Sequence, residues 1–227
     1  MSNTEQATSV SVIIPTYNRA HLIGRALHSL ANQTYKDFEV VIVDDASTDD
    51  TEAYIKGFSD LLKIQYVRHE KNKGEAAARN SGIRAARSEY VAFLDSDDEF
   101  VPEKLEKQMA VFQSQSPLLG VVYTNMREIS KDGNTRIWEC PTLMPEDGLV
   151  YERALNYGVY HIGIGSYMVR KACFERAGFF DERLSYHVDL DFFIRLSKFY
   201  YFYHIKEPLL NYYITGDSNR WNNPALF

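Results

Sequence analysis

A cluster of acidic side chains stands directly after an apolar run, in the stretch YVAFLDSDDEF over residues 90–100. Four carboxylates lie within five positions, and their mutual repulsion is costly unless a positive group lies among them. Mg²⁺ and Mn²⁺ are such groups, because they prefer oxygen ligands and often retain waters and phosphate oxygens. Asp97, with Asp95 beside it, is therefore predicted to hold a divalent metal ion that also binds a diphosphate.

Other interpretations of this cluster are weaker. An acidic run at a helix start, interacting only with the helix dipole and solvent, is the plainest alternative. An EF-hand loop needs glycine at its sixth position, but Phe100 stands there in a loop starting at Asp95, and Asp50 in one starting at Asp45. Phosphatases of the haloacid dehalogenase type carry D-x-D after their first strand, which here ends in Pro-Thr-Tyr-Asn. A strand that leads directly into D-x-D-D favours the metal site.

Strands and helices alternate through the first half of the chain. The sequence predicts buried strands over 10–14, 39–43, 64–67, 90–94 and 118–123, and helices over 20–33, 74–86 and 102–114 with another ending at residue 58. Pro15 is expected to stop the first strand. The strands lack polar alternation, which is typical of a parallel sheet covered by helices on both faces. Ligands of such sheets bind beyond the carboxyl ends of the strands, so residues 15–17, 44–45 and 95–98 are expected to meet on one edge.

The second half of the chain has a different pattern. Residues 127–138 contain the Asp-Gly-Asn centre of a hairpin turn, and helices are predicted near 149–157 and over 188–198. Two aromatic runs, at 200–205 and 209–214, predict two further strands. No Pro-, Gly- or Ser-rich stretch, low-complexity segment or internal repeat marks a boundary, so residues 1–227 are expected to form one α/β domain.

Composition argues against several classes of function. The formal charge of −6 at pH 7, without a Lys/Arg-rich run, indicates no nucleic-acid partner. Cys140 and Cys173 form no C-x-x-C motif, which favours a reduced cytoplasmic compartment and leaves one disulfide open. The polar start MSNTEQATS lacks the apolar core of a signal peptide. No run approaches the roughly 18 apolar residues of a transmembrane segment, while peripheral association with a membrane, at its cytoplasmic face, stays open.

The motifs at the predicted strand ends resemble those of family 2 inverting glycosyltransferases of the GT-A fold. The resemblance is carried by SVIIPTYNRAHLIGRALHSLANQTYKDFEVVIVDDASTDDT and NKGEAAARNSGIRAARSEYVAFLDSDDEF, and more loosely by GFFDERLSYHVDLDFFIRLSK. The tail also looks like the end of the spore-coat polysaccharide transferase type. The resemblance implies a Rossmann-like, mostly parallel central sheet flanked by helices. It also implies a nucleotide-sugar-binding half over about 9–115 and a smaller acceptor-side half over about 116–227.

The family pattern places a nucleoside-diphosphate sugar at these residues. Pro15 and Tyr17 match the turn after the first strand, where Tyr17 would stack near the nucleotide base. Asp45 matches the aspartate that accepts a hydrogen bond from the base, and a carboxylate is a strong acceptor for the imide N–H of uracil. A helix cap is the alternative role for Asp45. The resemblance favours UDP as the nucleotide and leaves dTDP and GDP open.

The resemblance assigns further donor-site roles around the acidic cluster. Arg79 matches an arginine that approaches the nucleotide or diphosphate, and its guanidinium would also relieve repulsion among the carboxylates. A purely structural salt bridge is the alternative for Arg79. Asp97 would bind the metal ion, and Asp95 would bind ribose or support the metal shell, with Ser96 between them in the donor site.

A second acidic pair, Asp189 and Asp191, begins the helix predicted over 188–198. Glycosyl transfer with inversion needs a base that takes the proton of the acceptor hydroxyl, and the family pattern puts it at Asp189. The family's preceding glutamate is Val188 here, which leaves the acceptor-binding role of that position open. Both aspartates could instead only start the helix, and Arg195 could pair with Asp191 four residues before it.

The sequence thus predicts a metal-dependent transferase that moves a sugar from a nucleoside diphosphate to a hydroxyl of a glycan or other acceptor. His161 and Arg220 are weaker candidates for the sugar and diphosphate sites. A sugar-1-phosphate nucleotidyltransferase is one rival, but PTYNRAHLIG lacks the Gly-rich loop with Arg and Lys expected after its first strand. A non-catalytic binder of nucleotide-sugar or glycan is the other. The donor sugar, the acceptor, the linkage and the oligomeric state are not predicted.

Overall fold

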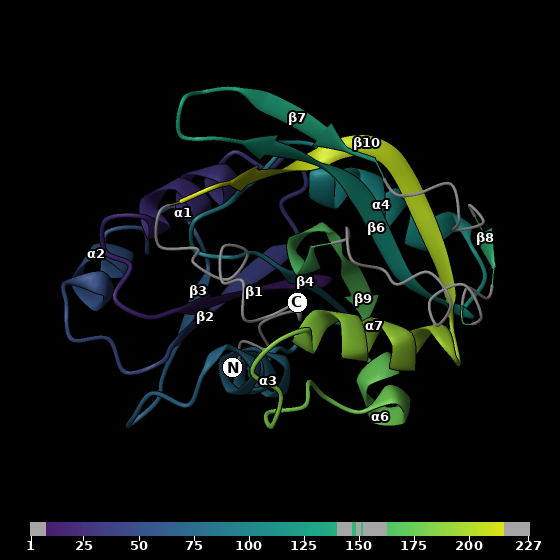
Figure 1. The fold of residues 1–227 in the computed structure, drawn as a ribbon, viewed down its shortest axis with the longest axis horizontal. Helices are drawn as coiled ribbons and strands as arrows, with labels where there is room; N and C mark the ends of the chain where they lie inside the picture. Colours follow the sequence, from purple (N-terminus) through teal and green to yellow (C-terminus); the bar gives the residue numbers. More distant parts are fainter. Residues whose placement is uncertain (1–7, 140–146, 149–150, 152–162, 216–227) are drawn as a thin grey trace, which may run out of the picture.

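The computed structural model describes residues 8–139, 147–148, 151 and 163–215, which form one mixed sheet with helices on both faces (Figure 1). Its strands are β1 (Val10–Thr16), β2 (Phe38–Asp44), β3 (Ile64–Arg68), β4 (Tyr90–Phe93), β5 (Glu99–Phe100), β6 (Leu119–Ile129), β7 (Thr135–Trp138), β8 (Asp147–Gly148), β9 (Met168–Arg170) and β10 (Tyr201–Tyr213). The helices are α1 (Ile23–Ala31), α2 (Thr51–Lys56), α3 (Glu75–Ala85), α4 (Lys104–Ser114), α6 (Cys173–Ala177) and α7 (Val188–Ser197), with a 3-10 turn η1 (Ile164–Ser166).

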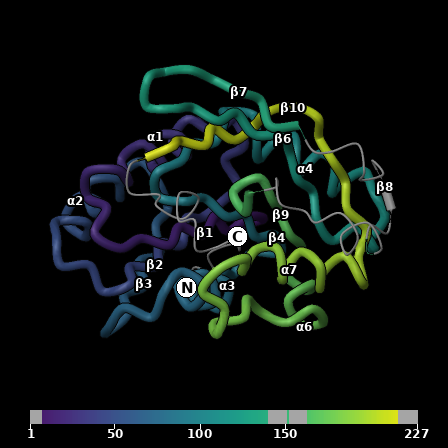
Figure 2. Tube along the Cα trace, viewed as in Figure 1, coloured from purple at the N-terminus to yellow at the C-terminus, as the bar shows by residue number. Residues whose placement is uncertain are grey.

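The strand order is β3-β2-β1-β4-β9-β6-β10-β5, with β7 paired to β6 and β8 to β10. The first four strands are parallel, as the sequence predicts. The short strand β9 runs antiparallel to both of its neighbours, β4 and β6, so the sheet is mixed at that position. Figure 2 shows β10, far along the chain, returning beside β6, to which it is parallel.

Pro15 does not end β1, which continues to Thr16. Pro15 pairs with Val43 of β2, whereas the pairing of β1 with β4 already stops at Ile13. Proline has no N–H to donate. It is tolerated at this position because β1 no longer pairs with β4 there, so no hydrogen bond to β4 is lost. The expected stop at Pro15 was therefore wrong, and the strand ends at Thr16, two residues beyond its predicted end.

The two faces of the sheet pack against different helices. Side chains of α3, α6 and α7 share one buried cluster with the sheet, and side chains of α1, α2 and α4 share another. Figure 1 shows the first set of helices along one side of the sheet and α1 and α4 toward the other. Alternate residues of β1 enter opposite clusters, Ile13 the first and Ile14 the second. Burial on both faces explains why the strands show no polar alternation.

The small residues of α3 let this helix lie close to the sheet. A Cβ added at Gly82 would come within 2.4 Å of Ile13 Cγ2. Ala76, Ala78 and Ile83 of the same helix are buried in the cluster. Arg79 and Asn80 follow Ala78 in this helix and are also buried. The close packing of α3 therefore fixes the backbone position from which these two side chains extend.

The second half of the chain differs from the sequence prediction in two ways. The aromatic runs form one strand, β10, with irregular register around Pro208, instead of two strands. The short elements β5, β9 and α6 were not predicted, since two to five residues carry too little periodicity to be recognised. The predicted hairpin is present as β6–β7, with Gly133 at φ 83° in its turn. The helix predicted near 149–157 lies outside the described residues, apart from residue 151.

Two further sequence-based expectations concern cysteines and membranes. Cys173 is a buried free thiol, and Cys140 lies outside the described residues. Among the helices in the described part of the chain, none has the length and apolar character required to cross a membrane.

Lys104, at the start of α4, has a completely buried side chain. Its ammonium nitrogen donates to Gln108 Oε1 at 2.6 Å and to the Ser166 carbonyl at 3.2 Å. Burial lowers the pKa of Lys104 well below its ordinary value. Lys104 therefore loses its proton at a lower pH in the folded protein than in the unfolded chain, which holds an ammonium up to a pH of about 10.4.

Because burial lowers the pKa of Lys104 in the folded protein, this residue should make the protein more stable as pH rises from 7 to 9. The slope that one group contributes is at most one proton, about 1.4 kcal/mol per pH unit. Lys104→Met should remove that slope, measured as the free energy of unfolding in urea at pH 7, 8 and 9. Lys107→Met, on the same helix but in a partly exposed pair with Glu207, is the control and should keep it. Equal slopes in all three proteins would show that Lys104 is charged in the folded state.

Candidate functional site

The carboxyl ends of β1, β2 and β4 meet at one edge of the sheet, as the sequence predicts. The Asp45 amide donates to the Thr16 carbonyl at 2.9 Å, which joins the ends of β1 and β2. The Leu94 amide donates to the Ile13 carbonyl at 3.0 Å, which joins the end of β4 to the same strand. Pro15 is half-buried and Tyr17, just beyond it, is 44% exposed.

Asp45 is buried and holds the loop that leads into α3. Its carboxylate accepts from the amides of Lys73, at 2.9 and 3.1 Å, and Gly74, at 2.8 Å. His69 Nδ1 lies 2.6 Å away, and the other ring nitrogen of His69 bonds Ser81 Oγ at 2.8 Å. Asp45 therefore fixes the start of α3 from the end of β2, a role other than the helix cap considered from the sequence.

The acidic stretch after β4 alternates in burial. Asp95, Asp97 and Glu99 are partly exposed, whereas Ser96 and Asp98 are buried at 7% and 2% exposure. Three carboxylates therefore reach solvent and one points into the protein. This division is what a metal-binding loop requires, with anions available to an ion and a buried residue that anchors the backbone.

Arg79 of α3 supplies the positive charge that the cluster needs. Its guanidinium is 4% exposed and donates to Asp95 Oδ1 at 2.8 Å, and it also pairs with Glu75. Burial alone would lower the pKa of Arg79. The neighbouring carboxylates, among which Glu75, Asp95 and Asp189 act most strongly, outweigh burial and raise its pKa. Arg79 is thus fully charged and already bound to the acidic loop without any ligand.

Arg79 does not neutralise the cluster completely. Burial raises the pKa of Asp95 to about 6, aided by the charges of Glu75 and Asp97 and opposed by Arg79. The Nε of Arg79 is buried and has no hydrogen-bond partner in the described part of the chain. The site therefore retains excess negative charge beside an unused donor.

Asp98 was not among the residues selected from the sequence, yet it ties the acidic loop to the end of β10. Its Oδ1 accepts from the Tyr213 amide at 2.9 Å. Burial and the charges of Asp95 and Asp97 raise the pKa of Asp98 well above its ordinary value. Two residues further on, the Thr215 hydroxyl lies 3.2 Å from Asp97 Oδ2. The D-x-D-D pattern indicated an acidic loop but could not show which aspartate turns inward.

Arg25 of α1 is a second cation at the loop that sequence reasoning missed. It donates from Nη1 to the Asp97 carbonyl at 3.0 Å, and its guanidinium lies 3.7 Å from the centre of the Tyr213 ring. Its Nε is 4.0 Å from Glu99. Arg25 therefore braces the backbone of Asp97 against α1 and leaves the carboxylate of Asp97 available.

The donor set of the loop fits a hard divalent cation. Within the described residues, no three or more His, Cys, Asp or Glu side chains are grouped to hold a metal ion by themselves. Mg²⁺ and Mn²⁺ bound through one or two carboxylates, with diphosphate oxygens and water completing the shell, do not need such a group. Asp97 and Asp95 are placed to supply these carboxylates.

The second acidic pair lies in the first turn of α7 and its two members differ. Asp191 accepts from Arg195 at 2.7 and 3.0 Å, which confirms the predicted helix pair. Within the described residues, the Asp189 carboxylate accepts a hydrogen bond only from the adjacent amide of Leu190, at 2.9 Å. Since Asp189 acts electrostatically on Arg79, it belongs to the same edge as the acidic loop. His161 and Arg220 lie outside the described residues.

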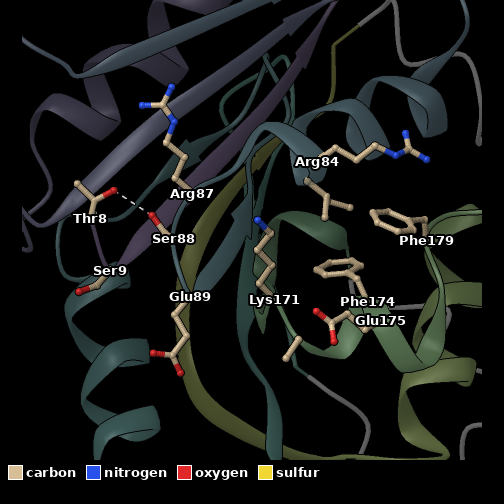
Figure 3. A pocket seen from close by; sticks show the side chains of 12 residues that line it. Thr8, Ser9, Arg84, Arg87, Ser88, Glu89, Lys171, Phe174, Glu175 and Phe179 are labelled. Carbon is tan, nitrogen blue, oxygen red and sulfur yellow. Dashed lines mark hydrogen bonds between the residues drawn. The ribbon is translucent and has the colours of Figure 1, made fainter. Parts of the chain in front are cut away.

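A hollow of about 670 Å³ lies at the opposite edge of the sheet (Figure 3). Its lining includes Thr8 and Ser88, which precede β1 and β4 and are joined by a hydrogen bond of 2.9 Å. Lys171, which follows the antiparallel strand β9, also lines it. None of the site residues predicted from the sequence lines this hollow.

The sequence profile of the family described as Glycosyl transferase family 2 matches residues 11–178. The chain belongs to glycosyl transferase family 2. This match confirms the family that the strand-end motifs indicated.

Relatives and solved structures agree with this family. An uncharacterised glycosyltransferase of Rickettsia bellii is 41% identical over 124 residues, 55% of this chain and 18% of that protein. WfgD of Escherichia coli, a UDP-Glc:alpha-D-GlcNAc-diphosphoundecaprenol beta-1,3-glucosyltransferase, is 36% identical over 54% of this chain and 47% of its own length. This family 2 chain thus spans about a fifth of the first relative and about half of the second.

The crystal structure of Staphylococcus aureus TarS residues 1–349 in complex with UDP has a similar fold. Its TM-score is 0.74 with 25% identity, covering 91% of the family 2 chain and 61% of that structure. The likeness confirms the predicted GT-A architecture, a mostly parallel sheet flanked by helices, for the described residues.

Asp45→Ala should destabilise the ligand-free family 2 protein, because two backbone amides and His69 lose their acceptor. We expect the free energy of unfolding to fall by about 2–4 kcal/mol. Urea denaturation without nucleotide measures this, with the exposed Asp60→Ala as the control. Unchanged stability in Asp45→Ala would mean that the carboxylate does not anchor α3.

Proposed function

We propose that this chain is a metal-dependent inverting glycosyltransferase, which moves a sugar from a nucleoside diphosphate to an acceptor hydroxyl. The observation that carries the proposal is the Arg79-bound acidic loop with Asp189 in electrostatic reach of the same guanidinium. The acidic loop would bind the donor, and Asp189 would activate the acceptor hydroxyl. Family membership supports transfer of a glycosyl group.

The donor is proposed to be a UDP-sugar. TarS is seen in complex with UDP, and the name of WfgD specifies UDP-Glc as its donor. Tyr17 is exposed at the end of β1 and is proposed to stack on the base, next to Pro15. Asp45 is proposed to accept the imide N–H of uracil. Its bonds to the α3 loop support that role by holding the carboxylate in one orientation.

The diphosphate and the metal ion are assigned to the loop after β4. Asp97 would bind the ion directly, with Asp95 and Ser96 beside it on the ribose or the metal shell. When bound, a divalent ion supplies Lewis acidity at the leaving diphosphate. Arg79 would face the same charge, because its guanidinium is held against Asp95 and its Nε has no partner in the described chain.

Asp189 is the proposed general base. Its carboxylate is partly exposed at the start of α7, where an acceptor hydroxyl could reach it. Asp191 is committed to Arg195 and is therefore the weaker candidate. Val188, in place of the family's glutamate, packs against the core cluster. A single carboxylate is sufficient to take the proton of a hydroxyl on a face opposite the leaving group.

The wider setting is also proposed. Residues about 9–115 would form the nucleotide-sugar-binding half and about 116–227 the acceptor-side half of one domain. The acceptor would be a glycan or another hydroxyl compound in polysaccharide or glycoconjugate synthesis, as the name of WfgD suggests for that relative. A cytoplasmic location, with peripheral association at a membrane, fits a nucleotide-sugar donor and a lipid-linked acceptor.

A non-catalytic binder of nucleotide-sugars is the rival that the geometry leaves in place. The partly exposed Asp189 beside the donor loop favours an enzyme, because binding alone needs no base there. Release of UDP from UDP-sugar, alone and with acceptor, separates the two functions.

Asp97→Ala should abolish the metal-dependent part of UDP binding. The ion would lose its protein anchor, while removal of one repelling carboxylate should leave the stability of the free protein unchanged. Thermal unfolding with UDP, with and without Mn²⁺, is the measurement, with dTDP and GDP in parallel. Wild type at 100 times Kd should gain about 2.7 kcal/mol. Asp60→Ala is the control, and a full Mn²⁺-dependent shift in Asp97→Ala would remove this residue from the metal role.

Asp189→Asn should separate catalysis from binding, because asparagine keeps size and polarity but accepts no proton near neutral pH. We expect transfer to fall by roughly 10²–10⁴-fold while affinity for UDP and Mn²⁺ stays close to wild type. UDP release with acceptor and calorimetric UDP affinity are the measurements. Asp191→Asn is the matched control and should lose far less activity. The reverse ranking of the two variants would assign the base to Asp191.

A further inference from the structure

The loop between α6 and α7, residues 178–187, delivers Asp189 to the site. Residues 182–187 of this loop are exposed, and His187 at its end adopts a left-handed conformation with φ 56°. Asp189 itself lies in the first turn of α7, whose buried side chains pack in the core cluster. Contacts made earlier in the loop add to this placement, because they set the path by which the chain enters α7.

Asn80 of α3 makes such a contact. Its side chain is buried, at 1% exposure. Nδ2 donates to the Phe180 carbonyl at 2.9 Å, and Oδ1 accepts from the Phe180 amide at 3.0 Å. Nδ2 also donates to Glu182 Oε1 at 2.8 Å. The amide of Asn80 thereby pairs with the loop backbone as a neighbouring strand would, and sets the direction in which the chain leaves Phe180.

Two other contacts of the loop differ in kind from this pairing. Arg195 of α7 donates to the carbonyls of Ala177 and Phe179. It therefore joins the start of the loop to the helix that follows the loop. The Phe180 ring packs on Phe93 of the sheet with ring centres 5.5 Å apart. A ring contact fixes the position of Phe180 but not the direction of its backbone, whereas a two-point hydrogen bond fixes both.

Asn80 is adjacent to Arg79, which binds the acidic loop. One rigid turn of α3, packed closely on β1 at Gly82, therefore holds the donor loop with one residue and the α6–α7 loop with the next. Resting on the proposed function, we propose that Asn80 is a positioning residue that sets Asp189 relative to the metal-bound diphosphate. Substrate and metal need not touch it.

Asn80→Ala should lower kcat on the order of 100-fold, the effect of a base displaced by about 1 Å, while UDP affinity with Mn²⁺ stays at the wild-type value. Glu182→Ala removes one of the three hydrogen bonds from an exposed position, so it should fold normally and lower kcat by less. Ser11→Ala, which removes a buried hydrogen bond to Glu39 near the amino end of β1, is the control for general destabilisation and should keep wild-type kcat.

Amide hydrogen exchange of the peptide covering residues 178–187 gives a readout independent of activity. In Asn80→Ala the Phe180 amide loses its acceptor and this peptide should exchange faster, while peptides of β1 and β4 keep their protection. Unchanged kcat in Asn80→Ala, a parallel loss of UDP affinity, or unchanged exchange of this peptide would each overturn the inference. If wild type transfers no sugar, the proposed function fails and the exchange of residues 178–187 alone decides whether Asn80 holds the loop.

Discussion

The burial of Arg79 against Asp95 is the interaction on which the candidate site depends. Two like charges 4 Å apart repel by about 4 kcal/mol at an effective dielectric constant of 20, so four carboxylates within five positions cannot fold together unaided. The protein resolves this in three ways. Arg79 neutralises Asp95, Asp98 turns inward onto the Tyr213 amide, and Arg25 braces the backbone. The loop thus combines paired and inward-turned carboxylates with the partly exposed Asp97, to which the metal ion is assigned in the proposed function.

Because Arg79 must be buried to act in this way, α3 has to lie close to the sheet, and its sequence is adapted to that position. Small residues bring the helix against β1, and Asp45 fixes its first turn from the end of β2. The same helix then reaches the loop before α7 through Asn80. One rigid element therefore contacts both the acidic loop and the loop before α7, although these two loops lie about a hundred positions apart in the chain.

The sequence predicted the parallel half of the sheet and the meeting of its strand ends well, because buried β-branched runs followed by polar strand ends carry a strong local signal. It predicted the Asp191–Arg195 pair for the same reason, since four-residue spacing on a helix is local. It did not predict β9, or that Asp98 differs from Asp97. Both depend on distant partners, Val91 and Tyr213 respectively, which no local pattern specifies. Pro15 does not end β1, because the pairing of β1 with β4 already stops at Ile13 and needs no N–H at residue 15.

The position before Asp189 shows how the site balances its charge. In the family pattern a glutamate stands there, but Val188 of this chain packs into the core. A second anion beside the base would disfavour further negative charge at this edge, where Asp95 and Asp97 already lie. Asp189 joins Glu75 and Asp95 in raising the pKa of Arg79. The proposed base is thus linked electrostatically to α3, through the residue that also pairs with the acidic loop.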